Sequence, residues 1–204
     1  HDAGYQVHIH TNGDEATAVA LDALEEVLSR NPRPDHRHTL QHCQMADEAQ
    51  FRRIKALGVC VNLFSNHLYY WGDQHMTETM GPDRARRMNA TGTAERLGVP
   101  FTIHSDTPIT PLDPLFTAWC AVNRLTESGE VLGPDECISV RSALRAITLG
   151  AAYTLKMDGE IGSIEAGKWA DFAVLDADPL EVDPRALKDV PVSGTMIGGR
   201  AVES

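Results

Sequence analysis

Two histidines and one aspartate, residue types that bind transition metals, stand at the ends of short predicted strands: His10, His42 and Asp106. In parallel α/β folds the carboxyl ends of strands share one edge, where ligands and catalytic groups collect. Taken alone, each residue would more readily be structural, the aspartate as the cap of the next turn. The coincidence of all three favours a metal site, and imidazole with carboxylate suits Zn, Fe, Mn or Ni.

Other side chains near these strands allow more than one interpretation. His8 and His10 point to the same face of one strand, so they could form a metal-binding pair, although we favour a hydrogen-bonding role for His8 one layer deeper. His104 precedes Asp106 by two residues and is expected in an inner layer or in contact with a ligand. The remaining histidines are expected on the surface or in packing: His1, His36, His38 and His75.

A polar and aromatic stretch, predicted to be a loop over residues 65–82, follows the third strand. In it, the neutral imidazole of His67 could contact a substrate or polarise its carbonyl group. Trp71, with Tyr69 and Tyr70, could line a pocket, or the aromatic cluster could anchor the loop. We therefore name His67 and Trp71 as candidate substrate-binding residues.

The elements that position these residues alternate between strand and helix. Each predicted helix has a capping aspartate or proline at its start, and Gly58 and Gly98 close the second and third helices. Four strand-helix units in series predict parallel strands with right-handed crossovers, and they make half of an eightfold βα barrel. The predicted strands cover residues 5–10, 38–42, 59–64 and 99–104; the helices cover 16–28 (capped by Asp14), 47–57 (Asp47), 83–97 (Asp83) and 115–125.

The last part of the chain has a different pattern. A helix is predicted over residues 139–155, and a glycine-rich turn region follows it. Residues 170–175 and 194–202 then read as strands of a small antiparallel unit. We place a boundary near Met157, which divides the chain into residues 1–157 and 158–204.

Composition excludes several classes of function. The 204 residues carry 18 Lys and Arg against 29 Asp and Glu, a net charge of −11, without a basic run. Nucleic acid and anionic membranes are therefore poor partners, and no apolar run has the length of a membrane span. The four cysteines form no C-x-x-C pair, which favours a reducing cytoplasm. The start at His1 followed by Gly4 resembles a helix end, so we expect the C-terminal part of a longer chain.

Four motifs together resemble the amidohydrolase superfamily, in the branch that includes N-substituted formamide deformylases. The resemblance covers essentially the whole chain, and the last motif is the most specific. The motifs are His10-Thr11-Asn12-Gly13-Asp14, Gln41-His42, His104-Ser105-Asp106-Thr107-Pro108 and the run from Gly162 to Phe172.

The resemblance implies the C-terminal half of a TIM-type (βα)8 barrel, with strands 5 to 8, followed by part of a small β-sandwich domain. It assigns His10, His42 and Asp106 as the metal ligands on strands 5, 6 and 8 of one or two divalent ions, most often zinc. The ligands of strands 1 to 4 are absent from this sequence. With two strand edges left unpaired, we expect a homo-oligomer or pairing with the missing N-terminal half.

The resemblance also implies a reaction: hydrolysis of a carbon-nitrogen bond other than a peptide bond, in amides or N-formyl and N-acyl amines, by a metal-activated water. Asp106 would orient the water and transfer its proton, and His67 would stabilise the developing oxyanion. The substrate would be a small molecule. The alternative is a catalytically incomplete fragment that folds and at most binds metal.

Overall fold

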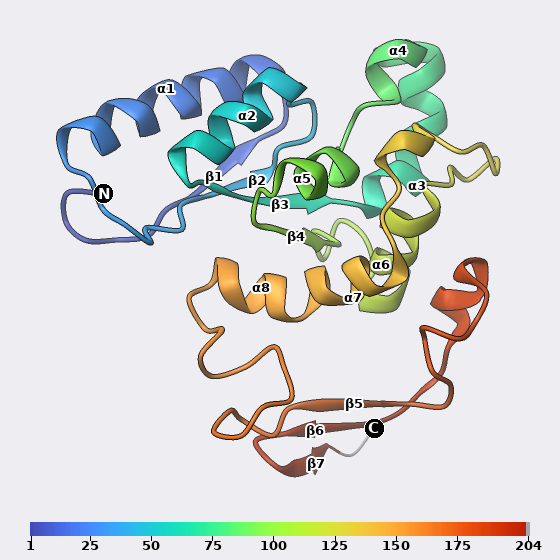
Figure 1. The fold of residues 1–204 in the computed structure, drawn as a ribbon. Coiled ribbons are helices and arrows are strands. Elements are labelled where there is room, and N and C mark those ends of the chain that lie inside the picture. The colour runs from blue at the N-terminus through green and yellow to red at the C-terminus, as the bar shows by residue number, and fades with distance from the viewer. Residues whose placement is uncertain (203–204) are drawn as a thin grey trace.

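The computed structural model describes residues 1–202, which form two separate sheets connected by helices (Figure 1). The first sheet has four parallel strands, each paired with the next one along the chain. The predicted alternation of parallel strands and helices is therefore confirmed. The strands are β1 (His8–Thr11), β2 (Thr39–His42), β3 (Cys60–Phe64) and β4 (Phe101–His104).

Helices cover the sheet and bury its apolar side chains. One set follows β1 to β3 and lies along one side of the sheet, while α7 and α8 pack against β4 (Figure 1). Leu21, Ile54 and Leu63 are fully buried between these layers, and burial of this kind supplies most of the driving force for folding. The helices are α1 (Asp14–Arg30), α2 (Glu48–Leu57), α5 (Thr91–Leu97), α6 (Pro114–Asn123), α7 (Val140–Ile147) and α8 (Leu149–Thr154).

Local capping signals were read correctly at some helix ends and wrongly at others. The Asp47 side chain accepts from the backbone N–H of Gln50 in a capping box, and left-handed Gly58 and Gly98 close α2 and α5, as predicted. Asp14 does not cap α1, because Gly13 holds that position. Asp83 likewise lies inside a short helix. Both carboxylates are in the first helical turn, where the helix dipole still favours negative charge.

The prediction of a loop over residues 65–82 was wrong. This stretch forms α3 (Asn66–Gln74), a π-helical turn η1 (His75–Thr79) and the start of α4 (Pro82–Ala85). Gly72 weakens the helical signal of α3, but the packing requires it, since an added Cβ would lie 2.7 Å from Thr126 Cγ2. The helix predicted to run to Leu97 is also interrupted, and α5 begins only at Thr91.

The second sheet is antiparallel, as expected, and lies apart from the first (Figure 1). It contains β5 (Phe172–Leu175), β6 (Val192–Ile197) and β7 (Arg200–Val202), so the single strand predicted over residues 194–202 is a hairpin. The 3-10 helix η3 (Pro184–Asp189) packs against α6, and Trp119 Nε1 donates to the Arg185 carbonyl at 2.8 Å.

The helix predicted over 139–155 breaks at Thr148. Between α6 and α7 lies the short 3-10 helix η2 (Pro134–Glu136).

Within residues 1–202, the helices are all too short or too polar to cross a lipid bilayer.

Candidate metal centre

Unusual backbone geometry turns two candidate ligands toward each other at the carboxyl edge of the parallel sheet. His42 ends β2 with φ +64°, and Asp106 lies two residues beyond β4 with φ +55°. Histidine and aspartate enter this left-handed region more readily than most residues, and such conformations cluster at functional sites. In a regular strand, His42 would point to the face opposite its neighbour Gln41. The left-handed turn instead brings its ring beside those of His10 and His104.

Three side chains form a compact group of metal-binding type. His42, His104 and Asp106 each offer a donor atom, and these atoms all lie within 4.8 Å of one another. The ring centroids of His42 and His104 are 5.0 Å apart, and His104 stacks on Phe64 at 5.1 Å. Two imidazoles with one carboxylate are a ligand set suited to zinc and similar divalent ions.

His10 lies next to this group without being part of it. Its ring meets that of His42 edge-on, with centroids 4.6 Å apart, and its side chain is exposed on β1. The structure thus brings together His42 and Asp106 as the sequence predicted, and it places His10 at their margin. It adds His104, which we had expected in an inner layer or in contact with a ligand. The ligand roles of His10, His42 and Asp106 remain predictions.

The protonation of His42, which is buried, and of His104, which is half-buried, fits metal binding. Burial lowers the pKa of His104 to about 3. It also lowers the pKa of His42, against an opposing effect of the Asp106 carboxylate. Both rings are therefore neutral at pH 7 and keep a lone pair. His42 Nδ1 and His104 Nε2 are buried without a hydrogen-bond partner among the described residues, which is costly unless a ligand satisfies them.

A second imidazole pair lies on the adjoining helical segment. His67, in the first turn of α3, packs against Phe64 and edge-on against Trp71, with ring centroids 5.2 Å and 4.7 Å away. Its Nε2 is 3.2 Å from Nε2 of His75, whose Nδ1 is 2.6 Å from Thr79 Oγ1. Burial lowers the pKa of His67 to about 4, so this ring is neutral. The sequence did not suggest that His75 touches His67, because a π-helical turn cannot be read from periodicity; such turns are frequent at functional sites.

His8 takes part in hydrogen bonds that run across three strands. Gln41 Nε2 donates to His8 Nδ1 at 2.7 Å, and Asn62 Nδ2 donates to Gln41 Oε1 at 2.6 Å. The expected hydrogen-bonding role of His8 is confirmed, although its side chain is exposed rather than in the core. His8 and His10 do not form a metal-binding group with a third donor in the described part of the chain.

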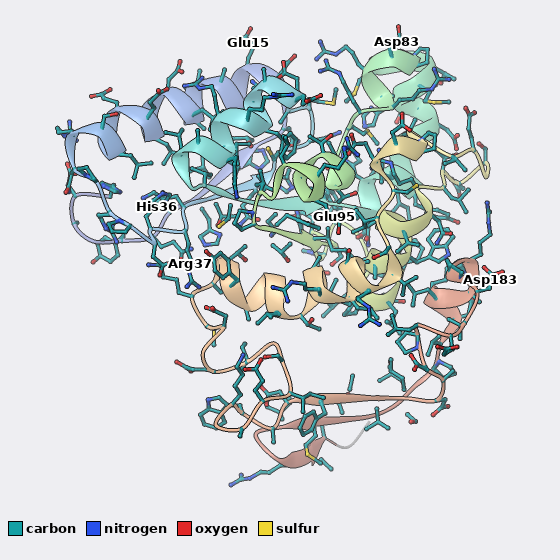
Figure 2. The ribbon with its side chains drawn as sticks, viewed as in Figure 1. Glu15, His36, Arg37, Asp83, Glu95 and Asp183 are labelled. Atoms are coloured by element: carbon teal, nitrogen blue, oxygen red, sulfur yellow. The ribbon has the colours of Figure 1, made fainter. Side chains whose placement is uncertain are left out.

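Two cavities lie at the opposite, amino-terminal end of the sheet. One, of about 460 Å³, adjoins the edge of β4 at Val99 and Phe101. The other, of about 750 Å³, lies beside the turn that carries His36 and Arg37, which are labelled in Figure 2. His38, next to them, is fully buried, as its expected packing role requires. Neither cavity is lined by His42, His104 or Asp106, so neither is the candidate metal site.

Fold and site together define a parallel βα scaffold that presents imidazoles and a carboxylate at one edge of the sheet. The chain belongs to the amidohydrolase family, whose profile matches residues 1–203. Two solved structures are similar, both described as uncharacterized metal-dependent hydrolases. The one from Pyrococcus horikoshii has a TM-score of 0.75 and 28% identity, covering 90% of this chain and 36% of that one. The one from Pyrococcus furiosus has a TM-score of 0.72 and 29% identity, covering 86% and 34%.

Curated relatives give the same family. The N-substituted formamide deformylase of Arthrobacter pascens is 31% identical over 196 residues, which cover 96% of this chain and 36% of the relative. The Bacillus subtilis protein YtcJ is 30% identical over 202 residues, which cover 98% and 37%. The chain thus spans about a third of the length of these relatives.

Proposed function

We propose that this chain is part of a metal-dependent hydrolase that cleaves carbon-nitrogen bonds other than peptide bonds, in amides or N-formyl and N-acyl amines. The observation that carries the proposal is the group of His42, His104 and Asp106 at the carboxyl edge of the parallel sheet. The reaction type is supported by the N-substituted formamide deformylase of Arthrobacter pascens, whose name specifies a formamide substrate.

The neutral, unpaired imidazole nitrogens fit a divalent ion, and zinc suits this donor set best. In the proposed site, the ligands predicted from the sequence, His10, His42 and Asp106, would hold the ion. When bound, the ion acts as a Lewis acid that lowers the pKa of water toward about 7. Asp106 orients the attacking water, accepts its proton on a carboxylate oxygen and returns that proton to the leaving nitrogen.

His67 and Trp71 complete the proposed site on the substrate side. Because the pKa of His67 is lowered to about 4, this ring donates a neutral N–H to the substrate oxygen as negative charge develops there. Trp71, in edge-on contact with His67, would limit the space beside the reacting carbonyl group.

In the complete protein, residues 1–157 would form the C-terminal half of a (βα)8 barrel and residues 158–204 part of a small β-sandwich. The exposed apolar side chains of the second sheet support this division, since another sheet could pack on the face that exposes Val174 or on the opposite face, which exposes Ile197. A cytoplasmic location is supported by the four cysteines, which are all free thiols.

The test is release of amine from simple N-formyl and N-acyl amines, measured with and without added zinc. Asp106→Asn should lower the rate by about 10² to 10⁴-fold, the usual contribution of a general acid-base group. Asp22→Asn is the matched control, since Asp22 is an exposed carboxylate paired with Arg53 on the surface. If the Asp106→Asn protein keeps its full rate, Asp106 has no part in the mechanism.

A second candidate function is metal binding without turnover, favoured by the chain's coverage of only about a third of its relatives. Stoichiometric zinc together with no amine release, for any of these substrates, would support this alternative. Zinc-dependent amine release by the purified chain would rule it out.

A further inference from the structure

We infer that His104 is itself a metal ligand, which completes with His42 and Asp106 a three-donor site that lies wholly within this chain and does not require His10. The inference rests on the proposed function in one respect, the presence of a divalent ion at this edge of the sheet. It differs in the residues that hold the ion and in the independence of the site from the rest of the protein.

The spacing of the donors is close to that of a bound ion. Ligand atoms at about 2.0–2.2 Å from one tetrahedral zinc ion lie about 3.3–3.6 Å from each other. The donor atoms of His42, His104 and Asp106 all lie within 4.8 Å of one another. Side-chain adjustments of about 1 Å would therefore suffice to bind the ion.

The surroundings of His104 hold its ring in place. The ring stacks on Phe64, with an interplanar angle of 22°, and lies beside His42. Its Nε2 is buried, and no other described residue hydrogen-bonds to it. A buried imidazole nitrogen without a partner is costly in a purely structural residue, and a metal ion would remove that cost.

Hydrogen bonds hold the backbone of the loop after β4, which carries Asp106. Ile109 N donates to the Asp106 carbonyl at 2.7 Å, and Thr107 Oγ1 donates to the Thr110 carbonyl at 3.2 Å. Asn66, at the start of α3, donates to Thr110 Oγ1 at 2.9 Å and so ties the loop to the neighbouring element. A preformed loop reduces the cost of organising the ligands.

His10 lacks these features. It is exposed on the outermost strand, and it meets His42 only at the ring edge. In this arrangement, His10 supports the orientation of His42 or adds a fourth donor after the ion has bound.

The experiment uses the full chain, stripped of metal with a chelator and titrated with Co²⁺, whose visible absorption reports the ligands around it. The variants are His104→Phe, which can keep the stack on Phe64, and His10→Phe, with His8→Gln as a control on the same sheet. Circular dichroism establishes that each variant folds, and His104→Asn serves as the replacement if His104→Phe does not fold.

We expect the unmodified chain to bind one Co²⁺. The His104 variant should bind it at least 100-fold more weakly, and its absorption at saturation should differ, because one imidazole has left the ion. His10→Phe should weaken binding less, and His8→Gln should not change it.

An unchanged saturated spectrum in the His104 variant would overturn the inference, since a residue that only positions a ligand alters affinity without altering the ligand set. If His10→Phe weakens binding and the His104 variant does not, the proposed function stands and the role of His104 is wrong. No binding by the unmodified chain would overturn the self-contained site.

Discussion

His75 Nε2 lies 3.2 Å from His67 Nε2, so one of these nitrogens carries a hydrogen and donates a hydrogen bond to the other. His75 Nδ1 also lies 2.6 Å from Thr79 Oγ1. Which of these two atoms donates the hydrogen bond determines which nitrogen carries the hydrogen in each imidazole ring. If Thr79 donates, His75 carries its proton on Nε2, and His67 carries its own on Nδ1. If Thr79 accepts, His67 Nδ1 has only a lone pair.

The proposed role of His67 as a donor to the substrate requires the first arrangement, since its Nδ1 is the buried nitrogen left without a partner. We therefore predict that ¹⁵N NMR finds His67 as the Nδ1–H tautomer at pH 7, and that His75→Phe increases the share of Nε2–H. Observation of His67 as Nε2–H in the unmodified protein would remove it as the oxyanion donor.

The stability of the protein should fall in mild acid because of His38. Its Nδ1 accepts from the backbone N–H of Val7 at 3.1 Å, and burial, aided by nearby His36 and Arg33, lowers its pKa from 6.5 to about 4. The unfolded chain therefore binds the proton first as the pH falls. Stability is complete above pH 6.5 and declines between pH 6.5 and about 4, by about 2 kcal/mol at pH 5.

Urea unfolding at pH 7.5 and pH 5.0 measures this loss. His38→Gln should have a smaller difference in unfolding free energy between the two pH values than the unmodified chain. An equal difference in both proteins would show that His38 does not cause the pH dependence.

Arg124 should be among the residues most important for stability. Its guanidinium is fully buried and donates to the carbonyls of Leu132, Asn89 and Met88 at 2.6, 3.0 and 2.9 Å. Lysine cannot reach all three acceptors, so Arg124→Lys leaves buried carbonyl groups unpaired. We predict a loss of about 3 kcal/mol in the free energy of unfolding.

Arg52→Lys is the control for this substitution, because Arg52 makes an exposed ion pair with Glu48. That change should cost less than about 0.5 kcal/mol. A similar small cost for Arg124→Lys would contradict the structural role assigned to the buried guanidinium.

Sequence patterns predicted the parts of the fold that depend on local chemistry. Asp47 and Gly58 mark the ends of α2 because capping and a left-handed glycine act within a few residues. The α3 helix was missed because its Gly72 is explained only by packing against Thr126, which is distant in the sequence. Gly150, in the broken helix after Ser139, has a similar cause, since a Cβ there would lie 2.7 Å from the Phe101 carbonyl.

The candidate site, like the fold, could be predicted only in part. Strand ends identified His42 and Asp106, because parallel strands bring their carboxyl ends to one edge. The place of His104 in the group was not predictable. It depends on the left-handed backbone conformation of His42 and Asp106, which cannot be recognised in the sequence.

The open edges of the parallel sheet predict association. Within residues 1–202, β1 pairs only with β2 and β4 only with β3. Unpaired edges of this kind favour pairing with another chain. Analytical ultracentrifugation should find a dimer, a larger homo-oligomer or, if the N-terminal half is supplied, a complex with it. A stable monomer of 22.3 kDa at all concentrations would contradict this expectation.

The location of bound metal tests the central claim most directly. Crystals of the chain grown with zinc should give an anomalous difference peak at the carboxyl edge of the parallel sheet, within about 2.0–2.2 Å of donor atoms on His42 and Asp106. A fully ordered structure with no peak between these two side chains, or with zinc bound only elsewhere, would contradict the metal site and the hydrolase mechanism built on it.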